Sequence, residues 1–143
     1  MALVASAIWF IQGVYTGNTH THTGESLPSV NWLPKSASNV SYYRSYINTA
    51  YEFDIDEAGF REWSRWVLSE IKKPVTISRY LDFSTPRPQK PLNQTQEEAA
   101  HWLLECSDRK VTIRDGLYYR HGGGFWVAYD RKHGRAYYHC SPH

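Results

Sequence analysis

The chain has 143 residues, a formal charge of +2 at pH 7 and only two cysteines. This length fits one domain with a respectable core and leaves little room for two. The small charge gives no sign of the strongly basic face that nucleic-acid binding requires, so no nucleic-acid partner is expected.

Residues 1–15 are apolar and contain no charged side chain. As a helix they would span about 21 Å, which is short of a bilayer core of roughly 30 Å. The length fits the hydrophobic core of a secretory signal, although no Lys or Arg precedes it. The alternative is a buried helix of the globular domain. We predict an apolar signal or anchor helix, which places the domain outside the cytoplasm, either secreted or anchored to the membrane.

Residues 16–32 are polar and lack hydrophobic periodicity, so we predict a flexible tether. His20 and His22 lie within it, but two imidazoles without further fixed ligands do not make a metal site. The folded domain is expected to cover residues 33–143 as a single α+β unit.

Two strands and a helix are predicted next. Residues 39–44 and 49–55 have strand character, and in the second of them apolar residues alternate with acidic ones. Asp54 or Asp56 can cap the helix that follows, and Pro74 marks its end. Its expected apolar stripe consists of Phe60, Trp63, Val67 and Ile71.

Residues 72–93 contain four prolines and predict an extended loop with polyproline character. Thr95 and Glu98 then form a capping box that starts a second helix. Apolar residues recur in this helix at helical spacing: Ala99, Trp102, Leu103 and Cys106. Such stripes are more often core against a sheet than a cofactor site.

The remaining residues predict a β-meander. Asp115-Gly116 is the strongest hairpin signal in the chain, and residues 125–130 and 135–140 are expected to be strands joined by a turn at residues 131–134. The predicted fold class is therefore α+β: an antiparallel sheet made of the N-terminal strand pair and this meander. Two amphipathic helices cover one face of the sheet, and an apolar N-terminal helix precedes it.

Three stretches carry a resemblance to other proteins: LPKSASNVSYY at 33–43, YEFDIDE at 51–57 and FREW at 60–63. They resemble small uncharacterised proteins of planctomycete-type bacteria, which pair an N-terminal membrane or signal segment with a domain that ends in a Tyr- and Gly-rich β region. The resemblance implies export and a shared fold. It implies no activity and transfers no functional residue.

The meander suggests a binding surface. Alternation is expected to expose arginines and aromatic rings, which are common anchors of recognition for proteins, peptides and carbohydrates. The candidate ligand-binding residues are Arg114, Tyr118, Arg120, Trp126, Tyr137 and His139, with Thr112 beside them. The alternative is that these Arg–Tyr pairs only stabilise the sheet.

The sequence contains residue types that are used in catalysis, but they form no recognisable catalytic motif. Cys106 or Cys140 could act with a histidine and a carboxylate such as Asp130, and a metal could be held by His121, His133 and His139. We assign no catalytic residue, metal ligand or cofactor. A disulfide between Cys106 and Cys140 is left open against free thiols. The sequence thus predicts a non-catalytic, exported or membrane-tethered binding protein, with a small metal- or Cys/His-dependent hydrolase as the alternative.

Overall fold

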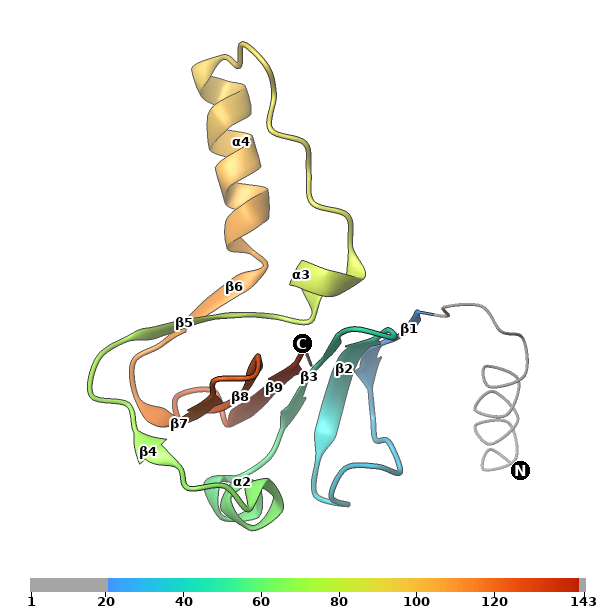
Figure 1. Ribbon diagram of the computed structural model, residues 1–143, viewed down its shortest axis with the longest axis vertical. Helices are drawn as coiled ribbons and strands as arrows, with labels where there is room; N and C mark the ends of the chain where they lie inside the picture. The colour runs from blue at the N-terminus through green and yellow to red at the C-terminus, as the bar shows by residue number, and fades with distance from the viewer. Residues whose placement is uncertain (1–20, 142–143) are drawn as a thin grey trace.

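The structure is a computed structural model that describes residues 21–141. It has an α+β fold built on a seven-stranded antiparallel sheet with the strand order β1-β2-β3-β9-β8-β7-β4, and β5 pairs with β6 in a separate ribbon (Figure 1). The strands are β1 His22–Leu27, β2 Ser38–Arg44, β3 Thr49–Asp54, β4 Ser69–Glu70, β5 Val75–Ser78, β6 Lys110–Ile113, β7 Gly116–His121, β8 Phe125–Asp130 and β9 Arg135–Cys140. The helices are α2 Glu57–Ser64, α3 Leu81–Ser84 and α4 Gln96–Ser107. The apolar segment predicted at residues 1–15 lies outside the described residues.

Strand β1 corrects the expected tether. It pairs antiparallel with β2, with His22 opposite Arg44 and Leu27 opposite Val40. Trp32 then makes T-shaped ring contacts with Tyr42 and Tyr51. The short, polar β1 lacks the apolar alternation by which strands are recognised, because it lies at the edge of the sheet. The prediction of a flexible tether is therefore wrong for residues 22–32.

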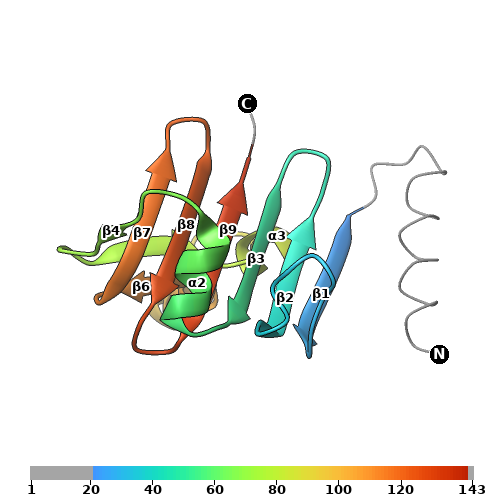
Figure 2. The ribbon, with the colours of Figure 1, turned by 90° about the horizontal axis from the view of Figure 1, so that it is seen from below.

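Helix α2 covers one face of the sheet (Figure 2). Asp56 caps it, since its Oδ1 accepts from the Gly59 N–H at 2.6 Å, and the Phe60 side chain of the helix is fully buried. The helix ends where Arg65 adopts a left-handed conformation (φ 53°). The predicted continuation of the helix to Pro74 is therefore wrong, and Val67 of the expected stripe is 85% exposed.

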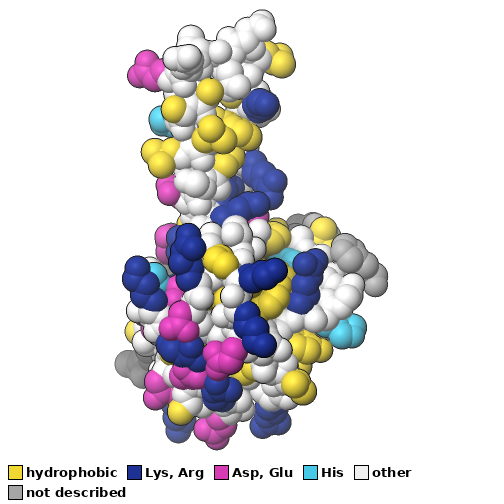
Figure 3. Space-filling model, turned by 90° about the vertical axis from the view of Figure 1, so that its left-hand side faces the viewer, with side chains coloured by type: hydrophobic (Ala, Val, Ile, Leu, Met, Phe, Trp, Pro, Cys, Tyr) yellow, Lys and Arg dark blue, Asp and Glu magenta, His cyan; other side chains and the backbone are white. Residues whose placement is uncertain are grey.

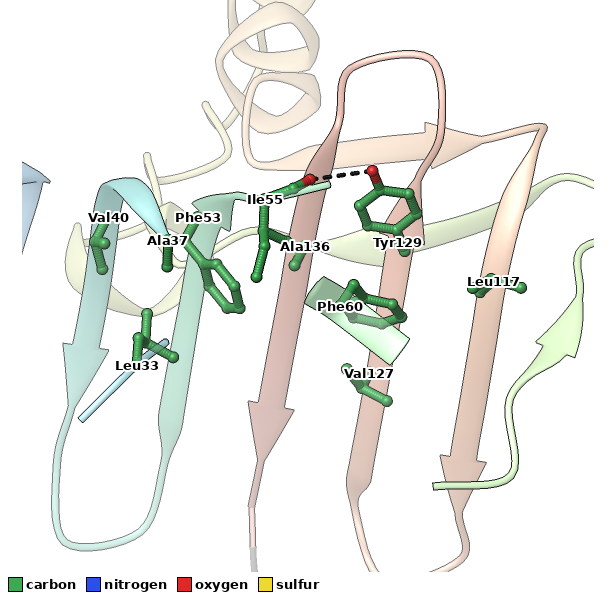
Figure 4. Packing of buried hydrophobic residues seen from close by; sticks show 10 residues of the cluster. All are labelled: Leu33, Ala37, Val40, Phe53, Ile55, Phe60, Leu117, Val127, Tyr129 and Ala136. Carbon is green, nitrogen blue, oxygen red and sulfur yellow. Dashed lines mark hydrogen bonds between the residues drawn. The ribbon is translucent and has the colours of Figure 1, made fainter. Parts of the chain in front are cut away.

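The main core lies between α2, the loop before β2 and this face of the sheet (Figure 4). Its buried members are Leu33, Ala37, Val40, Phe53, Ile55, Phe60, Leu117, Val127, Tyr129 and Ala136. Tyr129 stacks on Phe60 and donates its hydroxyl to the Ile55 carbonyl at 3.0 Å. The hydrogen bond satisfies the one polar atom that this ring takes into the core.

The β5–β6 ribbon crosses the opposite face of the sheet. Ile77 and Ile113 pack there in a second buried cluster with Ala128 and Tyr137. The prediction of an extended loop over residues 72–93 is therefore wrong where β5 and α3 form. Long-range pairing with β6, which follows about thirty residues later, organises β5.

Asp115-Gly116 is a corner between the ribbon and the sheet, and the predicted hairpin there is wrong. β6 pairs with β5, whereas β7 pairs with β8 and β4. Both carbonyls are used for these connections: Arg131 N–H donates to Asp115 O at 3.1 Å, and Ile71 N–H donates to Gly116 O at 2.9 Å. The rest of the meander, β7–β8–β9, is confirmed.

Helix α4 corrects the expected layer of two helices on one face. It begins with the predicted capping box at Thr95 and Glu98, yet it projects from the body as an arm together with residues 85–95 (Figure 1). None of its twelve residues is buried. Hydrophobic side chains are exposed along the arm, including Leu103 at 61% and Leu104 at 62% (Figure 3). Trp102 is anchored by donating from Nε1 to the Pro88 carbonyl at 3.0 Å.

Candidate functional site

The face of the sheet that carries the ribbon contains most of the predicted binding residues. The register aligns Tyr118, Ala128 and Tyr137 in one row across β7, β8 and β9, and Arg120, Trp126 and His139 in the next. Directly opposed residues in a sheet share a face, so the predicted alternation of these side chains holds.

Their exposure differs from the prediction. Arg114, Arg120 and Thr112 are exposed, and Tyr118, Trp126 and His139 are half-buried. Tyr137 is only 5% exposed because Ile77 and Ile113 of the ribbon pack over its row. The expectation of an open surface is therefore wrong at Tyr137.

His139 belongs to a stack of rings. Phe83 of α3 lies over its imidazole with the ring centroids 4.8 Å apart, and Trp126 stacks on it at 5.6 Å. Burial lowers the pKa of His139 below its ordinary value. A neutral imidazole between two aromatic rings packs as a ring, and the stack holds α3 on the sheet.

A polar cleft opens beside the ribbon at the other end of the same face. Its volume is about 620 Å³. Strands β1, β2, β3 and β9 supply its floor, and the end of β5 and the start of β6 supply its wall. The lining residues are Glu25, Ser26, Asn39, Ser41, Glu52, Asp54, Arg79, Tyr80, Leu81, Lys110, Val111, His133, Arg135 and Tyr137.

Glu52 is the centre of this cleft. Its carboxylate is 1% exposed and accepts from Arg79 Nη2 at 2.6 Å and Arg79 Nε at 3.2 Å. Arg135 Nη2 donates to the same carboxylate at 3.0 Å, and its Nη1 donates to Asp54 Oδ1 at 2.5 Å. Each hydrogen bond is charge-assisted and the Arg79 contact is two-pronged, so the network fixes these side chains in place.

The floor and wall of the cleft also contain two tyrosines. Burial, with the adjacent Glu52 carboxylate, raises the pKa of Tyr137 to about 12. Burial, with the Glu25 carboxylate, raises the pKa of Tyr80. Both phenols therefore stay neutral at physiological pH and offer a hydroxyl at the edge of an aromatic ring.

The rim carries His133 in the turn between β8 and β9. Its Nδ1 lies 2.6 Å from Oδ2 of Asp130, which is 3% exposed. Asp130 also accepts from the Lys132 N–H at 3.0 Å, so the carboxylate is held from two sides. The imidazole itself is 58% exposed.

The other ingredients of catalysis are dispersed. Cys106 lies on α4 and Cys140 ends β9, and both are free thiols, so the disulfide left open by the sequence is not formed. His121 ends β7, at the opposite end of the strands from His133. Among residues 21–141, no group of three or more His, Cys, Asp or Glu side chains is arranged to hold a metal ion.

The sequence interpretation missed Glu52, Arg79 and Arg135. Glu52 looked like an ordinary solvent-facing residue of an alternating strand. Its partners lie 27 and 83 residues away in the chain, so no local motif joins them. The available signal was weak: Glu52 and Arg135 lie on expected strands, and Arg79 lies in a segment expected to be an extended loop.

Comparison with known proteins adds no family: no family model, curated protein or solved structure matches the chain. In the part of the chain that the structure describes, no helix is long and apolar enough to cross a membrane.

Proposed function

We propose that this chain is a non-catalytic binding domain, exported and tethered to a membrane by its apolar N-terminal residues, whose cleft takes a neutral, hydroxyl-rich ligand of the carbohydrate class. The observation that carries the proposal is the charge balance of the cleft. Three carboxylates (Glu25, Glu52 and Asp54) face three cationic side chains (Arg79, Lys110 and Arg135). The volume of about 620 Å³ is within the range typical of small-molecule sites, roughly 300–1,000 Å³.

The balance favours a neutral ligand over an ion. The charges of Glu52 and Asp54 are matched by Arg79 and Arg135, so an anion or a cation would gain little net attraction there. Hydroxyl groups suit such a lining because each one donates to a carboxylate and accepts from a cation.

Preorganisation supports binding at this place. The ion pairs that hold Arg79 and Arg135 exist before any ligand arrives, so little side-chain freedom is lost when one binds. Lys110 and Glu25 are exposed on the rim and complete the set of donors and acceptors.

The tether rests on the sequence. Residues 1–15 are apolar and charge-free, and such a segment suits a secretory signal or an anchor. The proposed location is therefore membrane-anchored or secreted, with the domain outside the cytoplasm.

The cleft is tested by titrating the ¹⁵N-labelled protein with cellobiose, maltose and N,N′-diacetylchitobiose and following amide chemical shifts. We expect at least one sugar to shift amides of the cleft lining, above all around Glu25, Asn39 and Lys110. Shifts confined to other surfaces, or none with any sugar at millimolar concentration, would overturn the proposal.

A matched pair of variants locates the binding. Glu25→Gln with Lys110→Ala changes the rim without touching the Glu52 network, and we expect it to raise the Kd several-fold. Glu62→Gln with Lys72→Ala makes the same chemical changes at exposed positions outside the lining and should leave the Kd unchanged.

A second candidate function rests on the His133–Asp130 pair. A buried carboxylate that orients an imidazole at the rim of a cleft is the arrangement of a general base, so a small histidine-dependent hydrolase is the alternative. Steady release of p-nitrophenol from p-nitrophenyl acetate or glycosides, lost in His133→Asn, would favour it over simple binding.

A further inference from the structure

Four segments meet at the end of the sheet opposite the cleft. β1 begins there with His22 opposite Arg44, beside the turn between β2 and β3. Thr49 and Phe125 both lie opposite Cys140, which brings in the turn between β7 and β8 and the end of β9. The two turns lie on the same side of the sheet in Figure 2. We call this the proximal end: residues 22, 44–49, 120–125 and 139–141.

The proximal end contains none of the fourteen Asp and Glu residues of the chain. It carries the two arginines Arg44 and Arg120, both exposed, together with His22 and His121. Carboxylates are abundant at the other end of the same strands, where Asp54 and Asp130 lie. The sheet therefore has one basic end and one mixed end.

An apolar tip projects from the proximal end. Tyr46 and Ile47 are neighbours in the turn between β2 and β3. Tyr46 is 88% exposed and Ile47 is 60% exposed. The turn is well fixed, because Ser45 N–H donates to Asn48 O at 2.7 Å and Asn48 N–H donates to Ser45 Oγ at 3.0 Å. The tip is thus presented to solvent by an ordered backbone.

We infer that the proximal end rests on the surface of an anionic phospholipid membrane, with Tyr46 and Ile47 in the headgroup region and Arg44 and Arg120 against lipid phosphates. Tyrosine is enriched at membrane interfaces, exposed aliphatic residues insert there, and basic residues near the surface are attracted to anionic lipids. This inference rests on the proposed tether.

The sequence of residues 1–20 also favours a membrane as the surface that this end contacts. The twenty residues that precede the described part contain no Asp, Glu, Lys or Arg, and they join the fold next to His22, at this end. An anchor attached there holds the proximal end near the bilayer. A second copy of the chain suits this end less, because two such ends would bring arginines together with no carboxylate to pair with them.

The inference also orients the cleft. Asp54 and Arg135 lie opposite each other at the far end of β3 and β9 and line the cleft. With the proximal end on the membrane, the cleft opens away from the bilayer, where a water-soluble ligand can reach it.

The test is hydrogen exchange, measured by mass spectrometry, on the full chain in three settings: detergent micelles, vesicles of phosphatidylcholine, and vesicles of phosphatidylcholine with phosphatidylglycerol. We expect amides in residues 44–49 and 120–125 to exchange several-fold more slowly on the anionic vesicles than in micelles. Exchange in α4 and around the cleft should stay the same.

Two pairs of variants separate lipid contact from altered folding. Arg44→Gln with Arg120→Gln should abolish the effect of phosphatidylglycerol, whereas Arg114→Gln, an exposed arginine elsewhere, should preserve it. Tyr46→Ser with Ile47→Ser should weaken protection on both kinds of vesicle, and Leu92→Ser, which alters a side chain that is 94% exposed on the arm, should not.

The outcomes distinguish this inference from the tether. If the full chain does not sediment with either vesicle, the tether fails and the inference fails with it. If it sediments but residues 44–49 and 120–125 exchange as in micelles, the inference alone is overturned. Protection that rises with protein concentration in the absence of lipid would assign this end to a second copy and would also overturn it.

Discussion

Glu52 and Arg79 form a two-point ion pair between the sheet and the β5–β6 ribbon, with the carboxylate 1% exposed and the guanidinium about one-third exposed. Removing one partner of a buried pair is costly because the other charge stays buried without compensation. Arg79 can still reach water, and Arg135 keeps its ion pair with Asp54. We therefore expect a destabilisation at the lower end of the range that is usual for a broken buried ion pair.

Glu52→Gln should therefore lower the free energy of unfolding by about 3 kcal/mol. Arg61→Gln is the control, because Arg61 is 48% exposed in its pair with Glu57, and Glu57 keeps its ion pair with Arg131. Its loss should cost less than about 1 kcal/mol. Urea denaturation followed by tryptophan fluorescence measures both, and equal effects of the two substitutions would show that the Glu52 network adds little to stability.

The features that were predicted correctly from the sequence depend on residues that are close together in the chain. The capping box at Thr95, the cap at Asp56 and the alternation in β3, β8 and β9 each involve residues close together in the chain, and each is present. Capping and side-chain periodicity follow from backbone geometry alone, so tertiary context did not overturn them.

What the sequence missed depended on distant partners. β1 is polar and is a strand because β2 offers it an edge. Asp115-Gly116 is a corner whose carbonyls accept from Arg131 and Ile71, the residues that follow β8 and β4. The cleft could not be predicted, because the pairing of β3 with β9 brings Glu52 to Arg135 across 83 residues.

Glu57 gives the fold a pH dependence in acid. Hydrogen bonds from Arg131 and then from Arg61 lower its pKa from 4.5 to about 2. A carboxyl with a lowered pKa in the folded state stabilises that state fully above its unfolded pKa. The contribution is present above about pH 5 and is lost as the pH falls from 4.5 towards 2.

A carboxyl-detected NMR titration should find the pKa of Glu57 near 2, and Arg131→Gln should move it up towards its ordinary value. The urea midpoint of the unaltered protein should fall between pH 4.5 and 2, and this fall should be smaller in Arg131→Gln. An unchanged Glu57 titration in the variant would contradict the role of Arg131.

Two glycines differ sharply in what a side chain would meet. At Gly116 the backbone has φ +152°, and an added Cβ would collide with the carbonyl oxygen of Tyr129, a backbone atom that cannot move aside. At Gly122 nothing lies within 4 Å of an added Cβ. Gly116→Ala should destabilise the fold by about 2–3 kcal/mol, whereas Gly122→Ala should be within about 0.5 kcal/mol of neutral. Thermal unfolding of the two variants side by side checks this, and similar melting temperatures would contradict the corner geometry.

The α4 arm should unfold locally without the sheet. A helix of about 12 residues is marginal by itself in water, and none of the residues of α4 is buried. The base of the arm is held by Arg109, whose guanidinium donates to the carbonyls of Thr85 and Pro86, each at 2.8 Å.

Arg109→Ala should therefore speed amide exchange across residues 96–107 while the urea midpoint of the whole domain changes little, because the stability of an element with few packing contacts is separate from the global value. Arg114→Ala, an exposed arginine just beyond β6, should leave exchange in α4 unchanged. If Arg109→Ala instead lowered the global midpoint and left α4 protected, the arm would be an integral part of the cooperative unit, and its exposed leucines would need a covering surface that holds it in place.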